Sequence, residues 1–120
     1  MTDIVIVAAA RTAVGKFGGA LARTPAPELG AAVIINLLER ANLRGDQIGE
    51  VILGQVLAAG SGQHPARQTV IRTGFPQTVP ARTLTPVCGS RRTAVVRTAR
   101  ATASAPCGHR PAARRRNLRV

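Results

Sequence analysis

The sequence has few aromatic residues, few acidic residues and no long hydrophobic run. It contains two Phe and neither Trp nor Tyr, so a folded core must be built from aliphatic side chains. No stretch approaches the roughly 20 apolar residues of a transmembrane helix, which argues against membrane insertion. Asp3 and Arg11 bracket the short apolar run near the start, so we expect no secretory signal peptide.

Cysteine is also scarce. Cys88 and Cys107 are the two cysteines of the chain, and they lie in segments of very different composition. This arrangement argues against a disulfide framework and favours a reducing compartment. We therefore expect a cytoplasmic protein.

Charge is distributed unevenly along the chain. Residues 1–90 hold eight Lys or Arg and all five acidic residues, a net charge of +3, whereas residues 91–120 hold nine Arg and no acid. The basic character thus belongs to the end of the chain. That part consists mainly of Arg, Ala, Pro and Thr without a hydrophobic period, and we expect it to be a disordered tail.

The first half of the chain has the pattern of a strand, a helix and a second strand. Residues 4–10 form a continuous apolar run, which predicts a first strand buried on both faces of a sheet. Residues 25–41 predict a helix, because Pro25 and Glu28 mark its start and apolar residues recur at spacing four. Residues 50–57 predict a second strand. This order predicts α/β architecture with a right-handed crossover.

The same alternation continues beyond the second strand. A glycine-containing loop at residues 59–65 leads into a predicted helix at residues 65–72, which Gly74 ends. Residues 81–85 predict a third short strand. His64 could act as a general base, but a lone histidine in a loop is more often a polar or capping residue.

Cys88 is the central residue of the stretch PVCGS (residues 86–90), which lies between the third predicted strand and a helical segment. Strand, turn, nucleophile and helix is the order of nucleophile elbows, which expose a reactive side chain at a sheet edge. The unpaired N–H groups at a helix start favour the thiolate form of such a cysteine. Gly89 would let a ligand or another chain approach, and Ser90 could cap the helix. The alternative is that Cys88 is a small buried hydrophobe.

Several sequence blocks give these features a common explanation. They are VIVAAARTAVGKFGG (residues 5–19), PAPELG (25–30), VILGQVL (51–57), AGSGQHPARQ (59–68) and VCGS (87–90). In this order and spacing the blocks closely resemble the amino-terminal part of thiolases, the acetyl-CoA C-acetyltransferases.

The resemblance implies a role for the cysteine stretch. Cys88 matches the nucleophile that accepts an acyl group from acyl-CoA, after which a deprotonated second acetyl-CoA attacks the acyl-enzyme in a Claisen condensation, reversible by thiolysis. Gly89 and Ser90 would support the turn or add backbone N–H groups to an oxyanion hole. A coenzyme A thioester is implied as the substrate, with no metal or redox cofactor. The family forms homodimers or homotetramers and includes enzymes of fatty acid metabolism.

The resemblance covers part of the thiolase fold. Thiolases contain two similar βαβαβαββ halves, so residues 1–90 predict an incomplete first half, a βαβαβα unit with a mixed sheet, followed by the basic tail at residues 91–120. The family's second cysteine, which acts as acid or base, and its Asn-Glu-Ala-Phe and Gly-His-Pro segments belong to the second half. Residues 107–111 superficially echo the histidine loop, but their surroundings do not match. We therefore expect the isolated chain to be inactive.

The resemblance breaks at Arg91. Thiolases continue with a glycine and an apolar helix, whereas here Arg91 and Arg92 follow Ser90. We hypothesise that a frameshift, in the gene or in its sequencing, separates residues 1–90 from the tail, because a GC-rich gene read out of frame yields such a composition. Resequencing codons 88–97 tests this. A single clean frame, with no second thiolase half in another frame, would contradict the hypothesis.

Two other interpretations stay open. The tail could be the basic arm of a non-catalytic protein that binds nucleic acid through phosphate contacts. The lack of stacking aromatics and of a nucleic-acid-binding module argues against that partner. The chain could also be an inert truncated product with open sheet edges.

Overall fold

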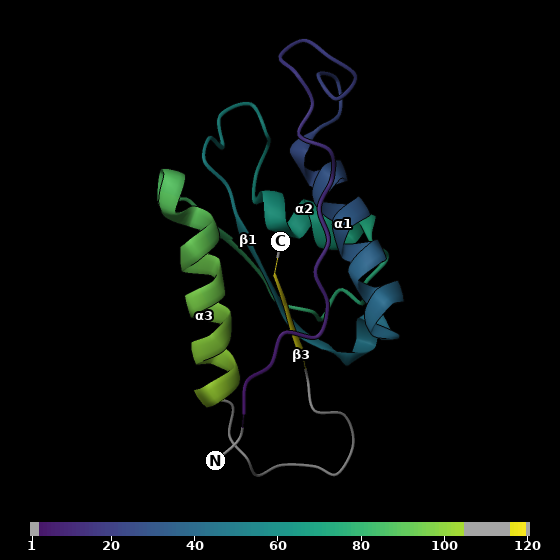
Figure 1. Cartoon of the computed structure of the whole chain (residues 1–120), viewed down its shortest axis with the longest axis vertical. Coiled ribbons are helices and arrows are strands. Elements are labelled where there is room, and N and C mark those ends of the chain that lie inside the picture. Colours follow the sequence, from purple (N-terminus) through teal and green to yellow (C-terminus); the bar gives the residue numbers. More distant parts are fainter. Residues whose placement is uncertain (1–2, 105–115, 120) are drawn as a thin grey trace.

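Helices and strands alternate along the chain in the computed structural model, which describes residues 3–104 and 116–119 (Figure 1). The predicted helices at residues 25–41 and 65–72 are confirmed, as are strands within residues 50–57 and 81–85. The elements in chain order are α1 (Ala26–Ala41), the 3₁₀ helix η1 (Gly45–Gln47), β1 (Ile48–Gly54), α2 (Pro65–Arg72), β2 (Ala81–Leu84), the 3₁₀ helix η2 (Val87–Gly89), α3 (Ser90–Ser104) and β3 (Arg116–Arg119).

The three strands form one sheet in the order β2-β1-β3, and both strand pairs are parallel. The expectation of a mixed sheet is therefore wrong for the described strands. Val51 pairs with Ala81 and Gly54 with Leu84, so the carboxyl ends of β1 and β2 lie at the same edge of the sheet. Parallel neighbours require a crossover connection, and α2 lies within the crossover between β1 and β2.

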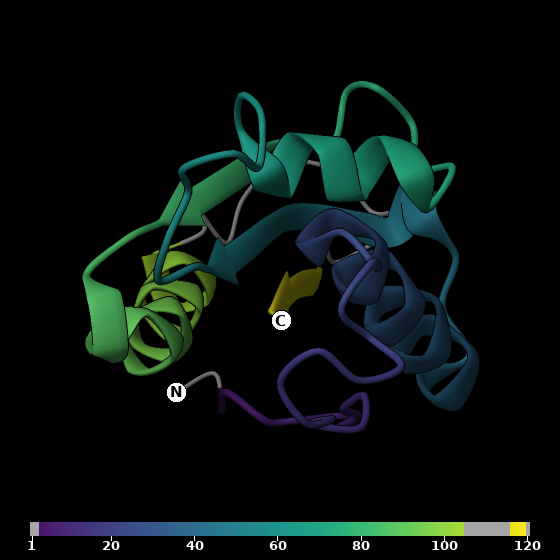
Figure 2. The same cartoon turned by 90° about the horizontal axis from the view of Figure 1, so that it is seen from above.

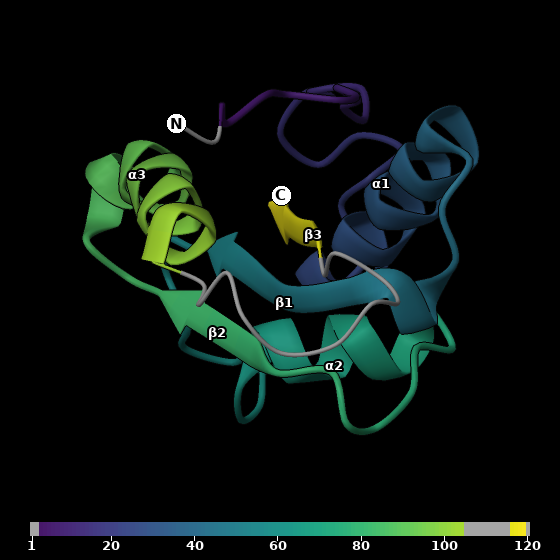
Figure 3. The same cartoon turned by 90° about the horizontal axis from the view of Figure 1, so that it is seen from below.

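Helices cover both faces of the sheet. Figures 2 and 3 show α1 and α2 on one face and α3 on the other. α1 packs along α2, whereas α3 packs against β1 and β3. The apolar residues of β1 are buried, as an uninterrupted apolar run in a central strand predicts. The main core cluster consists of Ile34, Ile48, Val51, Leu53, Ala66, Val70, Phe75 and Val79.

α1 has the predicted end signals, and its apolar stripe is buried as predicted. Pro25 precedes the helix, and Glu28 lies in the first turn, where a negative charge interacts favourably with the helix dipole. At the other end Asn42 adopts the left-handed conformation with φ of 50°, and its N–H donates to carbonyl oxygens of the last turn. The buried residues of α1 are Pro27, Ala31, Val33, Ile34 and Leu37.

Residues 4–10 do not form the predicted first strand. They run as an irregular segment on the side of the sheet formed by β3 (Figures 2 and 3). The reason is a missing backbone partner, because the place beside β1 is taken by β3. The β-branched residues at positions 4–7 are consequently between 48% and 84% exposed. The segment is held near α1 by Arg40, whose Nη1 donates to the carbonyl oxygen of Ala9 at 2.7 Å.

The first part of the predicted disordered tail is helical. α3 crosses the predicted boundary between residues 90 and 91, and residues 116–119 form β3, so the expectation of disorder is wrong for these two elements. Ala and Arg are good helix formers, which outweighs the weak apolar pattern of this segment. Residues 105–115, which include Cys107, lie outside the described residues. The division of the chain into residues 1–90 and 91–120 stays a prediction.

Ile34 and Ile35 offer a matched test of the core. Ile34 is completely buried in the core cluster, whereas Ile35, the next residue of α1, is 42% exposed. Ile34→Ala should lower the free energy of unfolding by about 2–5 kcal/mol, because it leaves a cavity. Ile35→Ala should change it by less than about 1 kcal/mol. Chemical denaturation followed by circular dichroism measures both, and equal losses would contradict this packing.

Candidate functional site

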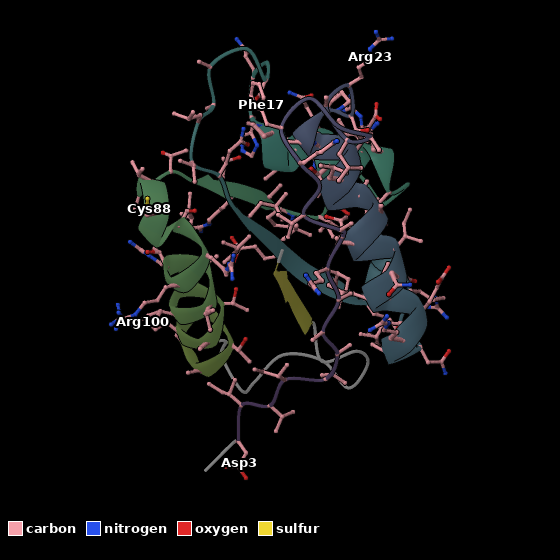
Figure 4. The ribbon with its side chains drawn as sticks, turned by 45° about the horizontal axis from the view of Figure 1, so that its top comes forward. Asp3, Phe17, Arg23, Cys88 and Arg100 are labelled. Carbon is pink, nitrogen blue, oxygen red and sulfur yellow. The ribbon has the colours of Figure 1, made fainter. Side chains whose placement is uncertain are left out.

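Cys88 lies in the turn between β2 and α3. β2 ends at Leu84, the 3₁₀ helix η2 contains Cys88, and α3 begins at Ser90. Figure 4 shows the cysteine beside the start of α3. The predicted order of strand, turn, cysteine and helix is thus confirmed. Because β1 and β2 are parallel, this turn lies at the carboxyl edge of the sheet, where α/β proteins bind ligands.

Both ends of the cysteine turn meet the same residue of β1. Leu84 is the sheet partner of Gly54, and the N–H of Gln55 donates to the Leu84 carbonyl oxygen at 2.9 Å. On the other side of the turn, the backbone of Ser90 touches Gly54 so closely that a Cβ on this glycine would lie 2.8 Å from the Ser90 carbonyl carbon. The chain from Leu84 to Ser90 therefore leaves Gly54 and returns to it.

This short closed loop carries backbone strain at Val87. Its φ is 47°, in the left-handed region, where a β-branched residue is an outlier. Such a conformation costs on the order of 1–3 kcal/mol and persists when the surroundings impose it. Two hydrogen bonds hold the turn: the N–H of Gly89 donates to the Pro86 carbonyl oxygen at 3.0 Å, and the N–H of Ser90 donates to that of Val87.

Cys88 is an exposed free thiol, which excludes the alternative of a small buried hydrophobe. Gly89 is also exposed, and a Cβ placed on it would meet nothing within 4 Å. The space beside the thiol is therefore open, as the predicted approach of a ligand requires. Ser90 is buried, with 5% of its surface exposed, and its backbone makes the contact with Gly54. A capping role of the Ser90 hydroxyl stays a prediction.

His64 caps α2. Its φ is 50°, and its Nδ1 accepts a hydrogen bond from the backbone N–H of Arg67 at 3.0 Å. The capping interpretation is thus confirmed, and Nδ1 is occupied by that bond. The preceding loop is tied down by two amide side chains: Gln55 Nε2 donates to Ser61 Oγ at 3.0 Å, and Gln68 Nε2 donates to the Ser61 carbonyl oxygen at 2.8 Å.

A small cavity lies on the other side of the end of β1. Its volume is about 100 Å³, enough for a few water molecules and far too small for a coenzyme A thioester. Gly54 lines this cavity as well as contacting Ser90. The other lining residues are Ala26, Pro27, Gly30, Leu53, Gln55, Pro65 and Thr69.

The described parts of the chain offer neither a metal-binding cluster nor a membrane-spanning helix. Residues 3–104 and 116–119 contain no group of three or more His, Cys, Asp or Glu side chains that could hold a metal ion. Within the same ranges no helix is both long enough and apolar enough to cross a membrane.

Sequence reasoning missed Gly54 and Val87. A glycine at the last position of a buried strand is a recognisable signal, since glycine inside a strand often marks close approach of another backbone. Nothing in the residue type of Val87 indicates a left-handed conformation. That strain arises from the closure of the loop on Gly54.

Comparison with known proteins agrees with this architecture. The family model for the thiolase N-terminal domain matches residues 4–108, which includes all of α3. An acetyl-CoA acetyltransferase of Cupriavidus necator is 63% identical over 101 residues, covering 84% of this chain and 26% of the relative. Acetyl-CoA acetyltransferases of Pseudomonas aeruginosa and Chromobacterium violaceum are 67% and 60% identical over 90 and 93 residues, covering 75% and 78% of this chain.

The matched lengths limit what the comparison covers. The chain spans about a quarter of the length of the curated relatives it matches, since 23% and 24% of the Pseudomonas and Chromobacterium proteins are covered. The family model, by contrast, covers most of the chain. On these matches, the chain belongs to the thiolase family, and residues 4–108 match the model of the family's N-terminal domain.

Proposed function

We propose that this chain supplies the acyl-accepting thiol of a thiolase-type acyltransferase, with Cys88 as the nucleophile. The observation that carries the proposal is the placement of Cys88. It is an exposed thiol at the carboxyl edge of the sheet, on a turn closed against Gly54, within the matched thiolase domain. The relatives named acetyl-CoA acetyltransferase support an acetyl-CoA thioester as the substrate.

The proposed chemistry has two transfers. The Cys88 thiolate attacks the thioester carbonyl carbon of acyl-CoA, a new S–C bond forms, and the coenzyme A thiolate leaves and takes up a proton. The α-carbon of a second acetyl-CoA, after losing a proton, then attacks the acyl-cysteine and expels the Cys88 thiolate. A thioester intermediate suits both steps, because a thiolate is a good nucleophile and a good leaving group.

Gly89 and Ser90 serve as turn support in this proposal. Their N–H groups already donate to the carbonyl oxygens of Pro86 and Val87. These donors stabilise the 3₁₀ turn that presents Cys88, and they are directed into the turn. An oxyanion hole would then be built from other donors than these two.

Acylation and turnover place different demands on the chain. By the family resemblance, the second cysteine and the Asn-Glu-Ala-Phe and Gly-His-Pro segments act in the second half of a thiolase. General acid and base groups each contribute about 10²–10⁴-fold to a rate. We therefore expect this chain to acylate Cys88 without turning over. We further propose that the reaction uses no metal or redox cofactor and that the protein is cytoplasmic. The resemblance to thiolases also implies a role in fatty acid metabolism and assembly as a homodimer or homotetramer.

Acetylation of Cys88 is the direct test. Incubation of the 120-residue chain with acetyl-CoA should add the mass of one acetyl group, detected by intact-mass spectrometry. Cys88→Ala should abolish the adduct, and because Cys107 remains in this variant, it is an internal control for unspecific thiol acetylation. Unchanged labelling of the variant would refute the assignment of the nucleophile. Acetoacetyl-CoA formation by the isolated chain would refute the expected lack of turnover.

Gly54→Ala tests whether the closed turn positions the thiol. The added Cβ would meet the Ser90 backbone at 2.8 Å, so the start of α3 must shift. The free energy of unfolding should fall by about 1–3 kcal/mol, and Cys88 acetylation should slow by up to about 100-fold, as expected for small displacements of a reacting group.

Gly89→Ala is the matched control for stability. A Cβ at this position enters open space, so the free energy of unfolding should change by less than about 0.5 kcal/mol. Thermal melts of the two variants decide the point. If Gly54→Ala and Gly89→Ala are equally stable, the contact between Gly54 and Ser90 does not constrain the turn.

A further inference from the structure

α3 presents a strongly basic surface that the proposed acyl transfer does not use. Four arginines of this helix are exposed, and we call them the α3 arginine surface: Arg91, Arg92, Arg97 and Arg100. Figure 4 shows the side chain of Arg100 pointing outward, away from the sheet. α3 contains no acidic residue, and the last acidic residue of the whole chain is Glu50.

The charges of this surface have no acidic partner within the described residues. Elsewhere arginines are paired, since Arg82 forms an ion pair with Glu50, and Arg44 forms one with Asp46 at 2.8 Å. No ion pair or side-chain hydrogen bond involves the four arginines of α3 in residues 3–104. Their positive charges therefore add, and a multivalent anion is the ligand that this field attracts.

We propose that the α3 arginine surface binds the phosphate backbone of double-stranded nucleic acid without reading its sequence. At 1.5 Å per residue the 15-residue helix is about 22 Å long, and its four arginines are distributed over more than half of the helix circumference. This arrangement suits a helix that lies against a groove with phosphates on both sides, since the major groove admits an α-helix.

A membrane surface fits α3 less well. A helix that binds lipid needs an apolar face opposite its basic one. The exposed side of α3 has a single large apolar side chain, Val96, at 41% exposure. Ser90 and Ala94, which are buried, belong to the side that packs on the sheet. The helix thus offers charge with little hydrophobic surface.

The lack of aromatic residues does not oppose this mode of binding. Stacking aromatics serve the recognition of single strands, and dedicated modules serve the reading of bases. Contacts to the phosphate backbone need neither, and they supply essentially all of non-specific affinity. The scarcity of aromatic residues is therefore compatible with non-specific binding to the phosphate backbone.

Salt dependence of duplex binding tests the proposal. The full chain should bind a fluorescently labelled DNA duplex, measured by anisotropy between about 50 and 200 mM salt. Four phosphate contacts contribute a slope of about −3.6 to log K against log salt, a weakening of about 150-fold over this range. Replacing the four arginines with Gln (R91Q/R92Q/R97Q/R100Q) should remove that contribution, and replacing them with Lys should retain it.

The control variant removes the same charge from another part of the surface. Arg11, Lys16, Arg23 and Arg72 are exposed, and R11Q/K16Q/R23Q/R72Q should leave most of the slope in place. Circular dichroism verifies that the variants keep their helices. Equal effects of the two Gln variants would overturn the proposal in favour of unspecific net charge. Absence of duplex binding, or binding to phosphatidylserine vesicles instead of DNA, would overturn it as well.

Discussion

The contact between Gly54 and the backbone of Ser90 is the constraint on which the geometry of the cysteine turn depends. It joins the end of the central strand to the start of α3, at a distance that no residue with a Cβ allows. The strand pairing of Leu84 with the same glycine fixes the other end of the turn. The chain between Leu84 and Ser90 is short, and Val87 within it adopts the left-handed conformation, which is unfavourable for a β-branched residue.

Much of the fold follows from local sequence signals. α1 has an apolar stripe, and both helices have clear end signals, such as Asn42 after α1 and Gly74 after α2, while the apolar run of β1 favours a buried strand. Residues 4–10 have an equally apolar composition, which predicts a first strand, yet they have no strand partner. A helix forms its hydrogen bonds within itself, whereas a strand needs a neighbour that composition does not specify.

The prediction of disorder is wrong for α3, because this helix packs on the sheet without large apolar side chains. The lack of an apolar period predicts disorder, but a helix at a sheet face can pack through small side chains when its backbone comes close enough. Ser90 and Ala94 meet that need, because Gly54 lets the helix approach β1. The packing of α3 is less favourable at Thr98, because its buried Oγ1 has no hydrogen-bond partner within the described residues, and such a group lowers stability.

Some features of the candidate site can be predicted from residue types, whereas others depend on contacts between backbone segments. Cys88 was recognisable from its place between a strand and a helix, and His64 from its place before Pro65. The contact between Gly54 and Ser90 and the strained conformation of Val87, by contrast, depend on how two backbone segments pack against each other. Because the packing of α3 near Cys88 rests on Ser90 and Ala94, the exposed positions of the helix are free to carry any charge.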